Sequence, residues 1–423
     1  MKRFSFIFLL FALLALPAVL KGNDIELFKI SKDILVPPSI AENGNSYIFI
    51  AKSVLTNLPT VYVSYQKRNG KFSNPVHAFD LNTVPEGLSE HFKNFNPSKP
   101  SRGWTGFESP TVQDKIITFG GTLESGKRGA FYAQNIAGKW HVFPLVLQGQ
   151  VDKNGNKFKY FNAPYITTDS KALFMATMVK MGTENETYDA VFSCKIRNFF
   201  RPSTPKLLIQ ANEHIYNFDD ISVAQAKFAT RADTNSGTQN MFIYDGTSQL
   251  IKTVPDKYRF LDRGEASIQL GGPTYYAGKI AFFAHSFDKN NKYISAIYCN
   301  AGDNNFSKPI VHTNKKYKIA GTKGYTIFTG EVSNPTLFIK GRKASVTFMG
   351  YPKTNSKRSG VYLATIKSGK VKLSAIAFPG QILPEGGEVK SVQIGAVSIR
   401  HDKVPIMVTL KSGIVKIGVV NVD

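Results

Sequence analysis

The sequence has few of the residues that usually mark a catalytic or metal centre. It contains only two cysteines, Cys194 and Cys299, and two tryptophans. None of its seven histidines lies within five residues of another, so no local pair has the spacing of a zinc site. It also lacks the Gly-x-Ser-x-Gly elbow of serine hydrolases and a Gly-Lys-Ser/Thr phosphate loop. We therefore assign no catalytic or metal-binding residue and expect no cofactor.

Long apolar runs are missing too, except at the N-terminus. Lys2 and Arg3 precede an unbroken apolar run over residues 6–16, which has the length of a signal-peptide core. A membrane-spanning helix needs about 20 apolar residues, and Lys21 interrupts this stretch earlier. The pattern predicts a signal peptide over residues 1–22 and hence an exported protein, either periplasmic or secreted.

Acidic residues are scarce beside basic ones. The net charge is +23, and residues 301–423 alone hold 19 Lys/Arg against 6 Asp/Glu. Such a field attracts anionic partners. For an exported monomer, we expect these to be an anionic glycan, a lipid surface or a protein, without specific recognition of nucleic acid.

What the chain has in abundance is Phe, Tyr and Gly, at 32, 18 and 34 residues. Aromatic and β-branched residues favour strands, and Gly-rich and polar clusters favour turns. A weak unit recurs, in which a small residue and Pro lead to an apolar strand ending near Phe and then to a strand of small, apolar and aromatic residues. Its seven copies begin near residues 38, 109, 163, 226, 272, 334 and 396.

These units predict an all-β fold over residues 23–423, a β-propeller of about seven four-stranded blades. The fourth and seventh units are the weakest, so six or eight blades remain alternatives. The last unit lacks an outer strand, and the segment 25–30 has no blade of its own. We predict that this N-terminal strand completes the last blade and closes the ring.

Residues 335–370 carry the pattern Pro-x-Leu, Gly-Arg-x-x-x-Val-x-Phe, Gly-Val-Tyr-Leu-Ala and Gly-x-x-Lys. The pattern resembles the repeats of uncharacterised exported bacterial β-propeller proteins. Residues 276–282, Tyr-Ala-Gly-Lys-Ile-Ala-Phe, are more loosely similar to TolB-type repeats, although the Ser-Pro-Asp of those repeats is missing. The resemblance implies a propeller and export, and it implies no catalytic residue.

The unit arrangement also makes predictions about single residues. Cys194 and Cys299 fall in equivalent strands of non-adjacent units, too far apart for a disulfide, so we expect two free, buried thiols. Most Phe and Tyr residues should form the core. Asp152 starts a segment like a calcium loop that lacks its closing Glu, so we predict a tight turn there. Asp219 and Asp220 should point to opposite faces of a strand and share no site.

Two features remain as candidate binding sites. The insertion at residues 81–107, part of which could form a short helix, contains Trp104, a candidate for loop-based binding. The candidates for contact with an anionic ligand are two basic clusters: Lys315, Lys316 and Lys318, and Lys353, Lys357 and Arg358. The first lies between units and the second within the sixth unit, so they need not share a surface.

The sequence therefore predicts an exported, non-catalytic binding or scaffolding propeller for an anionic ligand or a protein partner. The alternative is a glycan-active hydrolase or lyase with its site at a mouth of the central channel. That alternative requires carboxylates, or a His/Tyr/Arg group, to converge there.

Overall fold

The computed structural model describes residues 26–29, 34–93, 107–196, 202–219, 221–236, 239–247, 249–252, 269–287, 292–301, 306, 308–322, 324–353, 358–384 and 386–422. The regular elements of these residues are β-strands. None of them forms a helix of the length and apolar character needed to cross a bilayer. The predicted signal peptide lies outside the described residues.

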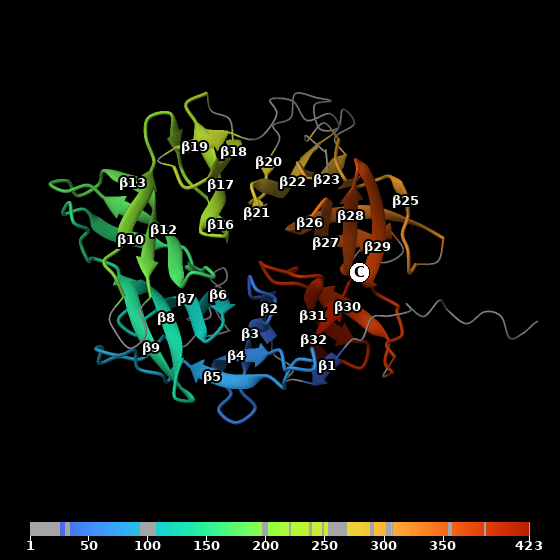
Figure 1. Cartoon of the computed structure of the whole chain (residues 1–423), viewed down its shortest axis with the longest axis horizontal. Coiled ribbons are helices and arrows are strands. Elements are labelled where there is room, and N and C mark those ends of the chain that lie inside the picture. Colours follow the sequence, from blue (N-terminus) through green and yellow to red (C-terminus); the bar gives the residue numbers. More distant parts are fainter. Residues whose placement is uncertain are drawn as a thin grey trace, which may run out of the picture.

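Seven antiparallel sheets surround one axis, which confirms the predicted seven-bladed propeller (Figure 1). Blades 1 to 3 consist of β2 (Ile34–Ile40), β3 (Ser46–Lys52), β4 (Pro59–Tyr65) and β5 (Val76–Asp80); β6 (Phe107–Gln113), β7 (Ile116–Thr122), β8 (Arg128–Ile136) and β9 (Lys139–Leu147); and β10 (Lys157–Phe161), β11 (Tyr165–Ile166), β12 (Lys171–Val179), β13 (Thr187–Lys195) and β14 (Lys206–Gln210).

Blades 4 and 5 consist of β15 (Ile215–Tyr216), β16 (Ile221–Ala224), β17 (Lys227–Thr234), β18 (Gln239–Tyr244) and β19 (Leu250–Lys252), and of β20 (Gln269–Leu270), β21 (Thr274–Tyr276), β22 (Lys279–Phe287), β23 (Tyr293–Cys299) and β24 (Val311–His312). Blades 6 and 7 consist of β25 (Lys316–Lys318), β26 (Tyr325–Lys340), β27 (Lys343–Pro352), β28 (Gly360–Lys367) and β29 (Lys370–Ala377), and of β30 (Val389–Gln393), β31 (Lys403–Leu410), β32 (Val415–Asn421) and β1 (Glu26–Lys29).

The ring closes as predicted, because the N-terminal strand β1 is the outer strand of blade 7. It pairs antiparallel with β32, from Glu26 opposite Val419 to Lys29 opposite Lys416. The first and last described strands of the chain therefore share one sheet. This pairing gives the ring a closure that does not depend on a covalent link.

The core lies between neighbouring blades, and strand alternation supplies it. Ile48 and Ile50 of β3 pack with the apolar residues of blade 2. Tyr47 and Phe49, on the other side of the same strand, pack with Met407 and the rest of blade 7. Because both sides of the sheet are covered, the six successive residues 46–51 of β3 are all buried. The prediction that the aromatic residues form the core is thus confirmed for these positions.

The two cysteines are free and buried, as predicted. Cys194 is the penultimate residue of β13 in blade 3, and Cys299 ends β23 of blade 5. Burial raises the pKa of each thiol to about 12. Neither is therefore a nucleophile at neutral pH.

The antiparallel connections give the propeller two distinct faces. We call lower face the one formed by the turns between the first and second strands of a blade and between the third and fourth strands. We call upper face the one formed by the loops between the second and third strands and between successive blades. Lys340 pairs with Lys343 and Lys367 with Lys370 at two lower turns of blade 6, which shows that these turns lie at the same end of the sheet.

Candidate functional site: the central channel

The innermost strand of every blade is irregular at the same level. The pairing of β2 with β3 shifts between Val36 and Ser39, and that of β26 with β27 shifts between Ser333 and Thr336. In blades 3, 4 and 5 the strand is interrupted altogether, between β10 and β11, β15 and β16, and β20 and β21. Most of these bulges contain Pro, which has no N–H to donate to the ladder. Seven bulges thus surround the axis.

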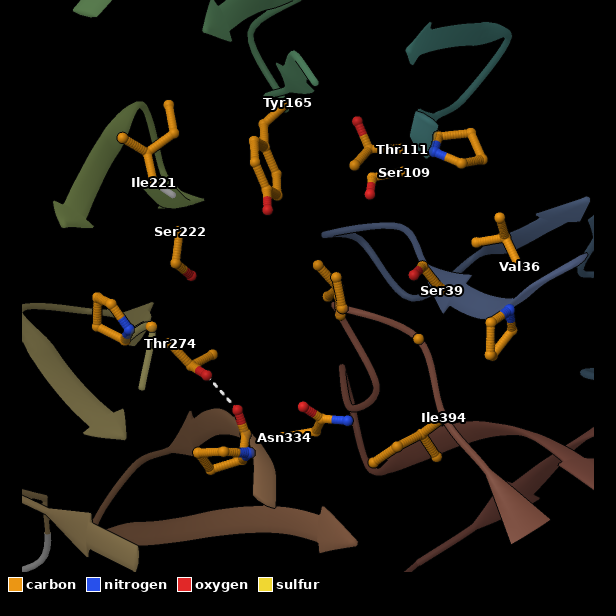
Figure 2. Close-up of a pocket in the computed structure, with 18 of the residues that line it drawn as sticks. Val36, Ser39, Ser109, Thr111, Tyr165, Ile221, Ser222, Thr274, Asn334 and Ile394 are labelled. Atoms are coloured by element: carbon orange, nitrogen blue, oxygen red, sulfur yellow. Dashed lines mark hydrogen bonds between the residues drawn. The ribbon is translucent and has the colours of Figure 1, made fainter. Parts of the chain in front are cut away.

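A cavity of about 460 Å³ lies inside this ring of bulges (Figure 2). Its volume is typical of a pocket for a small ligand or a peptide side chain. Hydroxyl groups, a carboxamide, Pro rings and aliphatic side chains line it. The polar side chains among the lining residues are those of Ser39, Ser109, Thr111, Tyr165, Ser222, Thr274 and Asn334.

Hydrogen bonds between blades hold the wall of this cavity. The Thr111 hydroxyl of blade 2 donates to the carbonyl oxygen of Pro164 in blade 3 over 3.3 Å. The Thr274 hydroxyl donates to the carbonyl oxygen of Pro335 in the next blade, a contact visible in Figure 2. The Ser222 hydroxyl instead accepts from the backbone N–H of Tyr275 at 2.9 Å. These bonds fix the lining residues, so the cavity is preorganised.

The lower end of the channel is crossed by Glu42, from the turn between β2 and β3. Its carboxylate accepts a hydrogen bond from the backbone N–H of Gln225, 2.7 Å away in blade 4, on the far side of the ring. It also interacts with the backbone of Thr168 in blade 3. Burial raises the pKa of Glu42, although the attraction of Arg400 partly opposes that shift.

Arg400, of blade 7, attracts this carboxylate electrostatically and has the largest fully buried side chain among the described residues. Its Nη1 donates to the carbonyl oxygens of Leu337 at 3.0 Å and Ile399 at 2.8 Å. Its guanidinium lies 4.8 Å from the centre of the Tyr276 ring, and its Nε has no hydrogen-bond partner among the described residues. Burial lowers the pKa of Arg400 to about 10, so it stays charged at neutral pH.

The structure brings the two predicted basic clusters to one end of blade 6. Strand β26 lies between β25 and β27. On one side of β26, Ile327 pairs with Lys316 of β25. On the other side, Phe328 pairs with Pro352 of β27, which precedes Lys353. Both clusters belong to the upper face. Because β25 joins the sheet of blade 6, the described residues of the two clusters lie at the same end of one blade, and their contact with an anionic ligand stays a prediction.

The other predicted residues are described only in part. Trp104 and Lys357 lie outside the described residues, as does Asp220. Residues 81–93 of the insertion form turns and no helix. The Asp152 carboxylate accepts hydrogen bonds from the backbone N–H groups of Asn154 and Asn156, at 2.8 and 2.9 Å, which confirms the tight turn.

The cavity itself was not predicted from the sequence. Pro110, Pro164, Pro273 and Pro335 marked the beginning of the repeat units, but the segments that contain them are the inner strands. The signal was present as a small residue, Pro and then a hydroxyl residue in several copies. It could be assigned to the channel only once the order of the strands in each blade was known.

Comparison with known proteins found similarity to solved structures alone. No protein-family model matches the chain, and no curated protein is significantly similar to it. Among solved structures it is similar to polysaccharide lyase Uly1 (9% identity, 94% of this chain and 99% of the other, TM-score 0.48). It is also similar to the β-propeller domain of the Trilobed protease from Pyrococcus furiosus (9%, 79% and 82%, 0.41) and to TolB from Acinetobacter baumannii (13%, 79% and 67%, 0.35).

Proposed function

We propose that this protein is an exported binding propeller that takes a segment of a protein partner on its upper face. The observation that carries the proposal is the distribution of exposed apolar side chains. On the turn between β3 and β4, Val54 is 82% exposed and Leu55 is 95% exposed. Met181, in the corresponding loop of blade 3, and Ile382, between blades 6 and 7, are also exposed.

These side chains belong to several blades, and they share a face with the interblade loops. Tyr216, Phe287 and Tyr325, at the upper ends of their strands, are exposed as well. On the lower face, Val76, Ile251 and Val371 are the exposed large apolar residues among those the structure describes. Exposed apolar side chains that are more frequent on one face than on the other favour that face for contact with a protein partner.

The cavity supplies the second part of the proposal. Glu42 and Arg400 occupy the lower end of the channel, so a ligand would enter from the upper face. The lining hydroxyl and carboxamide groups suit an uncharged polar side chain or a backbone turn. We therefore expect the partner to insert a neutral segment, with apolar residues contacting the loop tips around it.

A selection from a displayed random-peptide library tests this function, followed by binding titrations of the selected peptides. Leu55→Asp on the surface and Ser222→Phe, which would fill the cavity, should each weaken binding at least tenfold. Val371→Asp, an exposed apolar residue of the lower face, is the matched control and should bind like the wild type. Failure to select any peptide that Leu55→Asp weakens more than Val371→Asp would contradict the proposal.

Tyr165 is the one ionisable residue among the described residues that line the cavity, so the glycan-active alternative would need further groups from the lower end of the channel. Arg400 and Tyr276 are both buried there, and Arg400 has only 1% of its surface exposed. A polymer cannot reach these groups without opening the ring. Release of reducing ends or of unsaturated products from a panel of glycans would nevertheless favour an enzyme over the binding function.

A further inference from the structure

We infer that the lower face is a docking surface for an anionic lipid bilayer. The starting observation is a lysine at the same place in six blades, at the beginning of the second strand or directly before it. These lysines are Lys115, Lys171, Lys227, Lys279, Lys343 and Lys403. Each follows the turn that leads from the innermost strand, so together they surround the lower mouth of the channel.

Further basic residues occupy the outer part of the same face. Lys67, Arg68 and Lys71 lie in the connection between β4 and β5 of blade 1, the blade without a lysine at the repeated position. Lys139 begins β9, and Lys370 begins β29. The positive charge is therefore distributed over the whole lower face. It is not limited to the C-terminal blades, which have the largest excess of basic residues in the sequence.

The strand register places lysines opposite one another on this edge. Lys171 pairs with Lys195, and Lys367 pairs with Lys370. Like charges in directly opposed positions destabilise a sheet. Asp169 partly compensates the first pair, through an ion pair of 2.6 Å with Lys171. A bound anion would relieve such repulsion, so the arrangement favours a face that meets negative charge.

The shape of the charge distribution favours a bilayer over a linear polyanion. A chain such as an acidic polysaccharide is best matched by a groove or a stripe of charge, whereas these lysines form a ring on one flat end of the propeller. Anionic headgroups form a two-dimensional array that a charged disc can cover as a whole. The exposed large apolar residues described on this face are three separate side chains, those of Val76, Ile251 and Val371, so we expect contact at the headgroup level without deep insertion.

Docking of the lower face would leave the upper face pointing away from the membrane. The two inferences are separable, because the bilayer contact uses residues that contribute nothing to the cavity. Loss of peptide binding would contradict the proposed function alone, and loss of vesicle binding would contradict the docking surface alone.

Sedimentation with phospholipid vesicles tests the docking surface. The substitutions Lys115→Gln, Lys227→Gln and Lys279→Gln are combined in one variant, because these three lysines have no ion pair among the described residues. The matched control combines Lys315→Gln, Lys316→Gln and Lys318→Gln on the upper face, which changes the net charge equally.

Each lysine near an anionic bilayer contributes about a fivefold change in affinity, so the lower-face variant should bind phosphatidylglycerol-containing vesicles about a hundredfold more weakly than the wild type. The control should bind the vesicles like the wild type, and raised salt should release both the wild type and the control from the vesicles. Three results would overturn the inference: equal losses in the two variants, equal binding to pure phosphatidylcholine vesicles, or tighter binding of soluble dextran sulfate than of vesicles. Matching far-ultraviolet circular dichroism confirms that both variants are folded.

Discussion

Replacing Gly395 with alanine should weaken the junction at which the ring closes. The bulge of blade 7 approaches the bulge of blade 1 so closely that a Cβ on residue 395 would overlap the Ser39 hydroxyl and lie 2.6 Å from the carbonyl oxygen of Pro38. The backbone N–H of Gly395 donates to that same carbonyl over 3.0 Å. Next to it, the N–H of Ile40 donates to the carbonyl of Val397 over 2.9 Å.

The expected cost has two parts. Forcing an added methyl into a packed region costs about 1–3 kcal/mol, and weakening one of the two hydrogen bonds costs about 0.5–1.5 kcal/mol. We therefore expect Gly395→Ala to lower the free energy of unfolding by about 2–4 kcal/mol. Gly272, at the equivalent position of blade 5, provides the control, because its added Cβ meets nothing within 4 Å. Gly272→Ala should change stability by at most about 1 kcal/mol.

Equilibrium unfolding in urea measures both variants, provided that the slope of the transition stays that of the wild type. Hydrogen exchange adds a local measurement, because the amide of Ile40 should exchange faster in Gly395→Ala and unchanged in Gly272→Ala. Equal stabilities of the two variants would refute the view that close packing between blades 7 and 1 closes the ring.

Three further predictions concern buried groups. Because burial raises the pKa of both thiols to about 12, Cys194 and Cys299 should resist a thiol reagent at about pH 8 in the native protein and react once the protein unfolds. Fast labelling of either cysteine in the native protein would contradict their burial. Burial lowers the pKa of His312 below 6.5, so the imidazole takes up a proton more readily in the unfolded chain, and the free energy of unfolding falls as the pH drops below about 6.5. His312→Asn should flatten this part of the pH dependence of stability. An unchanged slope in the variant would contradict the assignment to His312. Glu42 and Arg400 attract each other, so a double-mutant cycle with Glu42→Gln and Arg400→Met should show a coupling of about 0.5–3 kcal/mol, whereas strict additivity would exclude the pair.

The blade count and the closure could be predicted because they follow from local patterns. A buried strand such as Tyr47–Ala51 stands out as a continuous apolar run, and it recurs with each blade. The N-terminal segment had no blade of its own and the last unit lacked an outer strand, so the sequence indicated that the two would pair, as β1 and β32 do. Both conclusions needed only periodicity and a count of strands.

The site could not be predicted because it depends on contacts between distant blades. The contact of Glu42 with Gln225 spans 183 residues, and the sequence offers no sign that these two turns face each other across the axis. The lysine after the first turn of six blades was visible in the sequence, for example at Lys279. It gained meaning only when the antiparallel order placed all such turns on one face. The number of basic residues along the chain therefore indicated the C-terminal blades as the binding region. In the structure, basic residues from almost all blades lie together on the lower face.

The pairing of β1 with β32 also sets an order of events in the life of the chain. Among the described strands, β1 leaves the ribosome before all the others, and its partner β32 leaves it after them. Until residues 415–421 are available, blade 7 has an open edge, and open edges invite pairing with other chains. A chain that stops short of β32 should therefore be recognisable to proteases and chaperones as unfinished, even when its first six blades have folded.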